Sequence, residues 1–203
     1  MYRYIIGLYY GRITELNLSG RNLTVLPDLS LYTNLQILRC DSNKLTSLDN
    51  LPHNLQILHC HNNQLTSLDN LHFNLRELYC WNNKITSLDN LPPTLQELYC
   101  HDNKLTRVDN LPPNLQTLYC HTNQITSLNN LPPNLQELWC RNNQLISLDI
   151  LPLTLRELHC KNNPIYTTCE ELYGFKLCKE TIEQYNEIKC IENVEKECYP
   201  LLK

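Results

Sequence analysis

The segment LQELYCHDNKLTRVDNL, residues 95–111, recurs along the chain with a period of 20 residues. Its apolar positions are Leu95, Leu98, Cys100, Leu105, Val108 and Leu111, and its one constant amide is Asn103. Two of these positions form unbroken rows through the chain: Cys40, Cys60, Cys80, Cys100, Cys120, Cys140 and Cys160, and Asn43, Asn63, Asn83, Asn103, Asn123, Asn143 and Asn163. A fixed period of this length is typical of a stacked array, because each unit buries its apolar face only against the next unit.

Each unit carries the pattern of one strand. Leu98 and Cys100 flank Tyr99, which is the alternation of a strand with one buried face. We therefore expect one strand per unit, centred near residues 38–40 in the first clear copy and 158–160 in the last, in a single parallel sheet.

The residues after each strand predict how the chain turns back. Asn103 and its equivalents should turn inward where the strand ends and bond the backbone groups that the bend leaves unpaired. Proline pairs precede the strands at residues 92–93, 112–113 and 132–133. They favour an extended return over a helix.

This pattern resembles the leucine-rich repeat family, at the short limit of its period range. Seven copies begin at Leu35, Leu55, Leu75, Leu95, Leu115, Leu135 and Leu155, and a weaker one begins at Ile13. The resemblance implies a solenoid of α/β type: a horseshoe of about eight repeats, with one parallel strand each and a mostly extended convex side. The segments LPPNL at 111–115 and 131–135 resemble the short repeats of bacterial effector proteins. The Asn-, Leu- and Cys-rich composition is also similar to that of repeat proteins of giant DNA viruses.

The ends of a solenoid expose its core and need covers. We divide the chain into an N-terminal cap, a solenoid and a short helical C-terminal cap, at residues 1–12, 13–165 and 166–203. In the last segment Thr168 and Glu171 have capping-box spacing, and apolar residues recur at helical spacing from Ile182 to Val194.

Composition excludes several classes of function. The chain has 17 basic and 21 acidic residues and a net charge of -4, which argues against a nucleic-acid partner. No stretch is apolar enough to span a membrane, and no glycine-rich phosphate loop is present. The N-terminal segment MYRYIIGLYY is a poor signal peptide. We expect an intracellular protein, in the host cytoplasm if it is viral.

The cysteines are interpreted as structural, and neither a cofactor nor a metal is expected. The seven-member row should point into the core, where a free cysteine behaves as a small hydrophobe. Cys100-His101-Asp102 matches the Cys-x-Asp string of a ligase domain in some bacterial repeat effectors, but its cysteine lies in the core row, so we interpret it as chance. Four further cysteines fit no zinc clip, and disulfide pairing or metal binding stays open for them: Cys169, Cys178, Cys190 and Cys198.

The outward strand positions are the ones that the scaffold leaves free. Between Leu and Cys they read Arg39, His59, Tyr79, Tyr99, Tyr119, Trp139 and His159. After Cys they read Asp41, His61, Trp81, His101, His121, Arg141 and Lys161. Before the second Leu they read Ile37, Ile57, Glu77, Glu97, Thr117, Glu137 and Glu157. An aromatic stripe therefore runs between a histidine-rich row and a glutamate-rich row.

We predict that this stripe binds a protein partner, because exposed aromatic clusters with polar rims are typical of interfaces. The predicted site, here called the sheet-face set, comprises Tyr79, Trp81, Tyr99, His101, Tyr119, His121, Trp139, Arg141, Glu77, Glu97 and Glu137. Two alternatives stay open: the rings only stack on one another and stiffen the sheet, or the histidines bind a metal, although solvated histidines are the favoured interpretation.

The predicted function is a monomeric, non-catalytic protein-interaction module whose partner the sequence does not identify. The alternatives are a substrate-recognition subunit for a ubiquitin ligase on a separate chain, and a purely structural or virion component. Affinity for a metal through the histidine row or the C-terminal cysteines is a further alternative.

Overall fold

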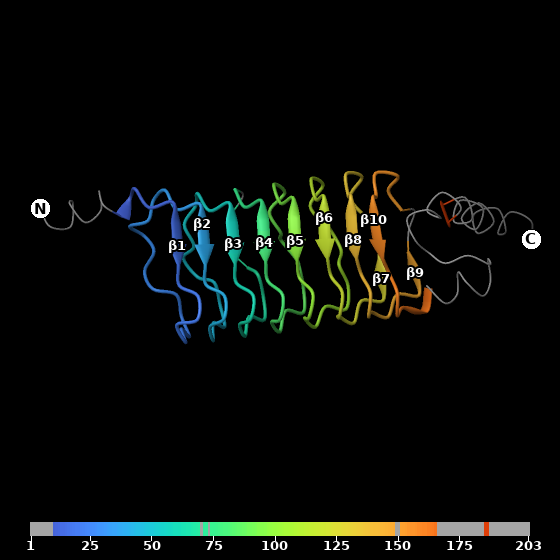
Figure 1. Cartoon of the computed structure of the whole chain (residues 1–203), viewed down its shortest axis with the longest axis horizontal. Coiled ribbons are helices and arrows are strands. Elements are labelled where there is room, and N and C mark those ends of the chain that lie inside the picture. The colour runs from blue at the N-terminus through green and yellow to red at the C-terminus, as the bar shows by residue number, and fades with distance from the viewer. Residues whose placement is uncertain (1–9, 70, 73, 149–150, 166–184, 187–203) are drawn as a thin grey trace, which may run out of the picture.

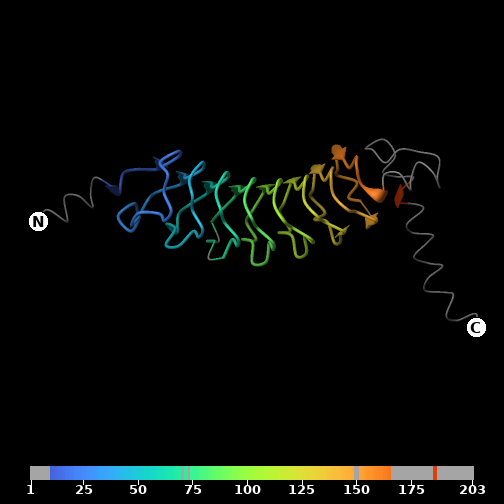
Figure 2. The same ribbon diagram turned by 90° about the horizontal axis from the view of Figure 1, so that it is seen from below.

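The computed structural model describes residues 10–69, 71–72, 74–148, 151–165 and 185–186. Eight short strands stand side by side in one parallel sheet, in the order β1-β2-β3-β4-β5-β6-β8-β10 (Figure 1). Their bounds are β1 Glu15–Asn17, β2 Ile37–Arg39, β3 Ile57–His59, β4 Glu77–Tyr79, β5 Glu97–Tyr99, β6 Thr117–Tyr119, β8 Glu137–Trp139 and β10 Glu157–His159. Figure 2 shows that the row of turns is gently bowed. The predicted parallel-strand solenoid is confirmed.

The register between strands follows the sequence period. Leu58 pairs with Leu78, and Leu78 pairs with Leu98, so equivalent residues of neighbouring repeats lie side by side. Each strand ends one residue before its cysteine, slightly earlier than predicted. The pairing nevertheless continues, because the backbone N–H of Cys80 donates to the carbonyl of Tyr99 at 2.9 Å.

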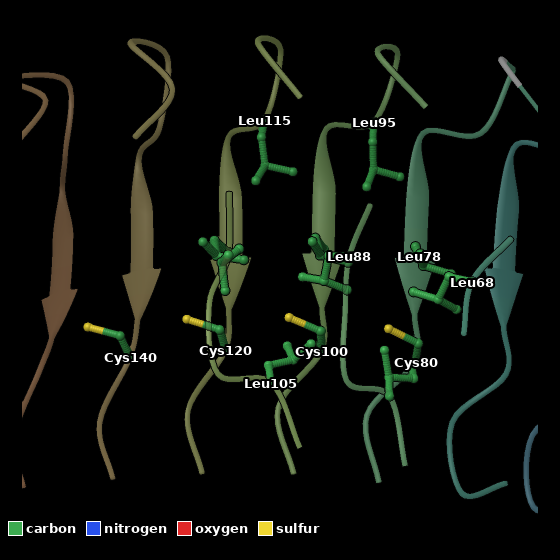
Figure 3. Close-up of a cluster of buried hydrophobic side chains, with 14 of the residues drawn as sticks. Leu68, Leu78, Cys80, Leu88, Leu95, Cys100, Leu105, Leu115, Cys120 and Cys140 are labelled. Atoms are coloured by element: carbon green, nitrogen blue, oxygen red, sulfur yellow. The ribbon is translucent and has the colours of Figure 1, made fainter. Parts of the chain in front are cut away.

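The core is a layered column of leucine and cysteine side chains. Leu78, Leu98 and Leu118 are completely buried, as are Cys80 and Cys100. In Figure 3 the cysteines from Cys80 to Cys140 occupy the same place in successive turns, between leucines from the strand and from the returning chain. All seven cysteines of the row are free thiols. This confirms that the row packs the core.

The asparagine row closes each turn as predicted. The Asn83 amide donates to the carbonyls of Cys60 at 3.1 Å and Cys80 at 3.0 Å, and its Oδ1 accepts from the N–H of Leu65 at 3.0 Å. One side chain thus bonds the backbone of two repeats. Because these are buried backbone groups, losing such an amide leaves costly unsatisfied donors and acceptors.

Left-handed backbone recurs at the first residue of this bend. Its φ is 51° at Asn82, 53° at Asp102 and 53° at Thr122. Asparagine and aspartate tolerate this conformation, whereas a β-branched threonine does so only under strain. The asparagine content of the repeat is therefore partly a consequence of backbone geometry.

The returning side differs in detail from the prediction. Proline pairs enter a turn and do not continue as an extended run, since the N–H of Leu95 donates to the carbonyl of Pro92 at 3.1 Å. Toward the C-terminal end, β7 Ser127–Leu128 pairs in parallel with β9 Ser147–Leu148 in a second, two-stranded sheet. The returning side is otherwise irregular within the described residues, in agreement with the predicted lack of convex helices.

The end segments are only partly described. At the N-terminal end, the rings of Tyr10 and Tyr32 lie 5.0 Å apart. At the other end, Tyr185 is completely buried and Asn186 bonds the backbone of Leu151. The described residues contain no complete helix, so the helical cap predicted for 166–203 is not supported. Apart from residues 185–186 it lies outside the described residues, as do its four cysteines and residues 1–9.

Candidate functional site

A continuous stack of rings covers the solvent side of the main sheet. We call it the Tyr column, and its members are His59, Tyr79, Tyr99, Tyr119, Trp139 and His159. Successive ring centroids lie 4.3, 4.7, 4.8, 4.9 and 4.0 Å apart. These distances are close to the separation of neighbouring strands. The parallel register therefore brings the rings into contact. Three of the five neighbouring pairs are stacked, whereas Tyr99–Tyr119 and Trp139–His159 are tilted, with planes inclined by 59° and 36°.

A second, shorter stack runs beside the first. This His column comprises His61, Trp81, His101 and His121, with successive centroids 3.8, 5.2 and 4.2 Å apart. The two columns meet edge to face, with the rings of Tyr79 and Trp81 6.0 Å apart and inclined by 82°. At the C-terminal end Arg141 places its guanidinium 5.1 Å from the centre of the Trp139 ring, a cation–π contact.

Glutamates bond the tyrosine hydroxyls along the other edge of the Tyr column. Tyr79 donates to Glu77 at 2.9 Å and Tyr99 donates to Glu97 at 3.1 Å. Tyr119 has no glutamate on its own strand and donates instead to Glu137 of the next, at 3.1 Å. The structure thus brings the eleven residues of the sheet-face set onto one surface.

These bonds change the electrostatics of the phenols. Burial, followed by the Glu137 carboxylate, raises the pKa of Tyr119 to about 12. Burial likewise raises the pKa of Tyr79 and of Tyr99 well above the usual range, with Glu77 and Glu97 adding to it. The hydroxyls therefore stay protonated, and each orients a charged carboxylate.

The stacking determines which atoms of the rings are accessible to a partner. Where the rings are stacked, their faces are covered by neighbouring rings, so a partner meets mainly ring edges and the row of carboxylates. The hydroxyls of Tyr79, Tyr99 and Tyr119 are all bonded to glutamates. The Trp139 indole nitrogen is buried without a hydrogen-bond partner. The carboxylates are therefore the polar groups that these tyrosines present to a partner.

Two histidines of the His column sit in an environment that favours the neutral ring. Burial lowers the pKa of His61 to about 4, and it lowers that of His121 to about 4, where His101 and Arg141 add to the effect. The Nδ1 atoms of His61 and His121 are buried and have no hydrogen-bond partner. Neither ring position is fixed by a bond at this nitrogen.

The arrangement offers no activated nucleophile among the described cysteines. Burial raises the pKa of the Cys100 thiol to about 12, and burial raises that of Cys80 well above its usual range. A reactive cysteine needs a lowered pKa and an accessible thiolate. Cys100 therefore has a packing role, although its neighbours His101 and Asp102 do contact each other at 2.7 Å.

The predicted set missed four residues that extend the surface. His59 and His159 lengthen the Tyr column, and Glu157 continues the glutamate row beside His159 at 3.8 Å. These three residues occupy the same repeat positions as predicted members of the set, so the 20-residue period alone could have identified them. Asp102 was missed because the equivalent position of most repeats holds asparagine. The replacement of that asparagine by a carboxylate was the signal that could have identified it.

Two comparisons identify the repeat. Residues 53–92 and 93–133 match the family described as Leucine Rich repeats (2 copies). YopM from Yersinia enterocolitica WA-314 is similar in structure, with 38% identity and a TM-score of 0.70 over 74% of this chain and 33% of that one. The functional domain of InlJ from Listeria monocytogenes, which includes a cysteine ladder, gives 39% identity and a TM-score of 0.68 over 75% of this chain and 35% of that one.

A Shigella effector LRR domain is similar over more of its own length. It gives 27% identity and a TM-score of 0.68, covering 82% of this chain and 76% of that one. No curated protein matches the sequence. The chain spans about a third of the length of the YopM and InlJ structures. The giant-virus resemblance is not shown and stays a prediction.

None of the described residues forms a helix long and apolar enough to cross a membrane. The repeat sequence, the parallel register and the structural likenesses agree with one another. Residues 53–133 match leucine-rich repeats, and the parallel-strand solenoid is similar in structure to YopM and to the Shigella effector LRR domain.

Proposed function

We propose that the chain is a non-catalytic interaction module that binds a protein partner through the sheet-face set. Leucine-rich repeats are in general protein-interaction modules and typically non-enzymatic scaffolds, and this is the starting point of the proposal. The observation that carries it is the three Tyr–Glu hydrogen bonds on a continuous ring stack. Core packing needs none of these side chains, because it is complete beneath them.

Preorganisation supports binding through this surface. Tyr99 is held between Tyr79 and Tyr119, and its hydroxyl is bonded to Glu97. Such a side chain has little conformational entropy left to lose when a partner docks. A stacked aromatic surface of this kind therefore offers contact area at low cost.

The charge pattern supports a partner with basic groups. Glu77, Glu97 and Glu137 form a one-sided row along the Tyr column. Their carboxylates keep further acceptor capacity after each takes one phenol hydrogen bond. Lysine or arginine side chains beside an apolar contact would pair with this row and set the orientation of the partner.

Several finer points belong to the same proposal. We expect a monomer in a reducing, intracellular compartment, which the seven free thiols of the core row support. That residues 166–203 cover the last repeat stays a prediction. A ubiquitin-ligase recognition subunit and a virion component stay predictions, since no contact among the described residues favours either.

Affinity capture from the source cell with matched variants tests the proposal. Changing Tyr99 and Trp139 together to Ala removes two rings of the Tyr column, and we expect capture to weaken by at least about 2 kcal/mol. Ser67 and Ser87 lie outside the main sheet, and changing both to Ala should leave capture unchanged. Both variants must first melt as the wild type does. If a stable Tyr99 and Trp139 variant captures the partner as well as the wild type does, the rings only stiffen the sheet and the proposed site is wrong.

A further inference from the structure

We propose that His101, Asp102 and His121 form a binding site for a transition-metal dication, with zinc and nickel the best-suited ions. One ring nitrogen of each histidine and one carboxylate oxygen of Asp102 all lie within 4.8 Å of one another. Within the part of the chain that the structure describes, no other three His, Cys, Asp or Glu side chains converge in this way. Imidazole nitrogen and carboxylate oxygen are ligands that zinc and nickel accept.

The repeat geometry holds the three ligands in place. His101 and His121 follow Cys100 and Cys120 in neighbouring repeats, and their rings stack with centroids 4.2 Å apart and planes inclined by 11°. The backbone N–H of Asp102 donates to the carbonyl of His121 at 3.1 Å. His101 and Asp102 are thus adjacent in sequence, and the backbone hydrogen bond between the two repeats holds His121 beside them.

Asp102 departs from the pattern of its row. The equivalent positions of most other repeats hold asparagine, and Asn82 bonds Asn62 through its side chain at 2.6 Å. Asp102 has the same left-handed backbone but points a carboxylate oxygen to the Nδ1 of His101 at 2.7 Å. The scaffold does not require a carboxylate here. It occurs in the repeat whose histidine stacks on a second histidine.

Metal binding requires a modest closure of the three side chains. Bonds of about 2.1 Å from nitrogen or oxygen to one ion place the ligand atoms roughly 3–3.5 Å apart. His101 Nδ1 and Asp102 are already 2.7 Å apart, so the approach, of up to about 1.5 Å, falls mainly on His121. One of the parallel rings must also turn so that both lone pairs face the ion. The buried Nδ1 of His121 has no hydrogen bond to lose on such a rotation. Water would complete the coordination.

Trp81 provides a built-in reporter of this closure. Its ring stacks on His101 at 5.2 Å with planes inclined by 12°, so turning His101 changes the surroundings of the indole. The chain has only two tryptophans. The other, Trp139, lies 6.5 Å from the His121 ring. A Trp81→Phe variant therefore separates the two signals.

The test is a titration of the full chain with Zn²⁺ or Ni²⁺ alone, followed by calorimetry and tryptophan fluorescence. We expect saturable binding of one ion per chain, with a fluorescence change that Trp81→Phe largely removes. Asp102→Asn, which restores the residue of the neighbouring repeat, and His121→Asn should each weaken binding by about tenfold or more. His53→Asn is the matched control, because this exposed histidine lies outside the trio and outside both ring columns, and it should bind as the wild type does.

A titration with Co²⁺ distinguishes this site from metal binding by the C-terminal cysteines. Co²⁺ bound by nitrogen and oxygen lacks the thiolate charge-transfer absorption that a cysteine site produces. Wild-type protein that does not bind Zn²⁺ or Ni²⁺ saturably overturns the proposal. So does equal affinity in the Asp102 and His121 variants, or a Co²⁺ spectrum with thiolate bands. The titration contains no partner protein, so its outcome is independent of the proposed function.

Discussion

The hydroxyl of Tyr185 bonds both backbone groups of Leu148: it donates to the carbonyl at 2.6 Å and accepts from the N–H at 3.2 Å. Leu148 belongs to β9, whose other side pairs with β7. Asn186 repeats the arrangement with Leu151, donating to its carbonyl at 2.7 Å and accepting from its N–H at 2.8 Å. Two side chains thereby satisfy an edge that another repeat would otherwise pair with, which discourages edge-to-edge association.

Removing this hydroxyl should weaken the C-terminal end. Tyr185→Phe keeps the buried ring but leaves the N–H and carbonyl of Leu148 without these bonds. We expect a loss of about 1–3 kcal/mol in the free energy of unfolding, measured by chemical denaturation. Tyr119→Phe removes a hydroxyl that bonds a half-exposed glutamate, so its loss should be smaller. Wild-type stability in Tyr185→Phe would show that the contact is incidental.

The sequence predicted the parts of the fold that repeat. A period of 20 residues was enough to place the strands, the buried cysteines and the inward asparagines, because each depends only on spacing. The Tyr185–Leu148 contact joins residues 37 apart and breaks the period, so no repeat pattern contains it. The Tyr–Glu hydrogen bonds also escaped prediction: Tyr119 reaches across to Glu137, a choice that the side-chain rotamers decide.

The left-handed threonine offers a stabilising substitution. Thr122 has φ 53°, whereas asparagine occupies the same bend at Asn82, Asn142 and Asn162. Thr122→Asn should relieve backbone strain and raise the free energy of unfolding by about 1 kcal/mol. Thr106→Asn is the matched control, since Thr106 is exposed and has no positive φ. A gain of equal size at both positions would point to side-chain composition and not to backbone strain.

The core thiols should be chemically silent until the protein unfolds. Cys60, Cys80 and Cys120 are completely buried, and burial raises the pKa of each thiol well above its usual range. Thiol titration should find the seven cysteines of the row unreactive in the native state and reactive in denaturant. Because these thiols form no disulfides, adding reductant should not lower the melting temperature through them. Rapid labelling of Cys100 in the native protein would contradict this packing role.

Acid should destabilise the protein through His61. Burial lowers its folded pKa to about 4 from an ordinary value of 6.5, against the opposing effect of Asp41 at 3.9 Å. The unfolded chain therefore binds a proton that the folded protein excludes. The stability from His61 is complete above pH 6.5 and is lost as the pH falls from 6.5 toward 4.

Denaturation at a series of pH values tests this directly. His61→Phe keeps a ring on Trp81 but removes the titrating group, so its stability should fall less steeply with acid than that of the wild type. Ser67→Ala, an exposed substitution that removes no titrating group, should follow the wild-type curve. Identical slopes for His61→Phe and the wild type would mean that the His61 proton is not excluded by folding.

Photo-crosslinking from the glutamate row tests the central claim, that the partner docks on the sheet face. Thr117 pairs with Glu97 and Glu137 on the neighbouring strands, and a photoreactive side chain there replaces no ring of the Tyr column. Ser67, exposed outside the main sheet, is the control position. We expect an adduct with the captured partner from position 117 and none from position 67. An adduct from position 67 alone would place the interface elsewhere and contradict the sheet-face assignment.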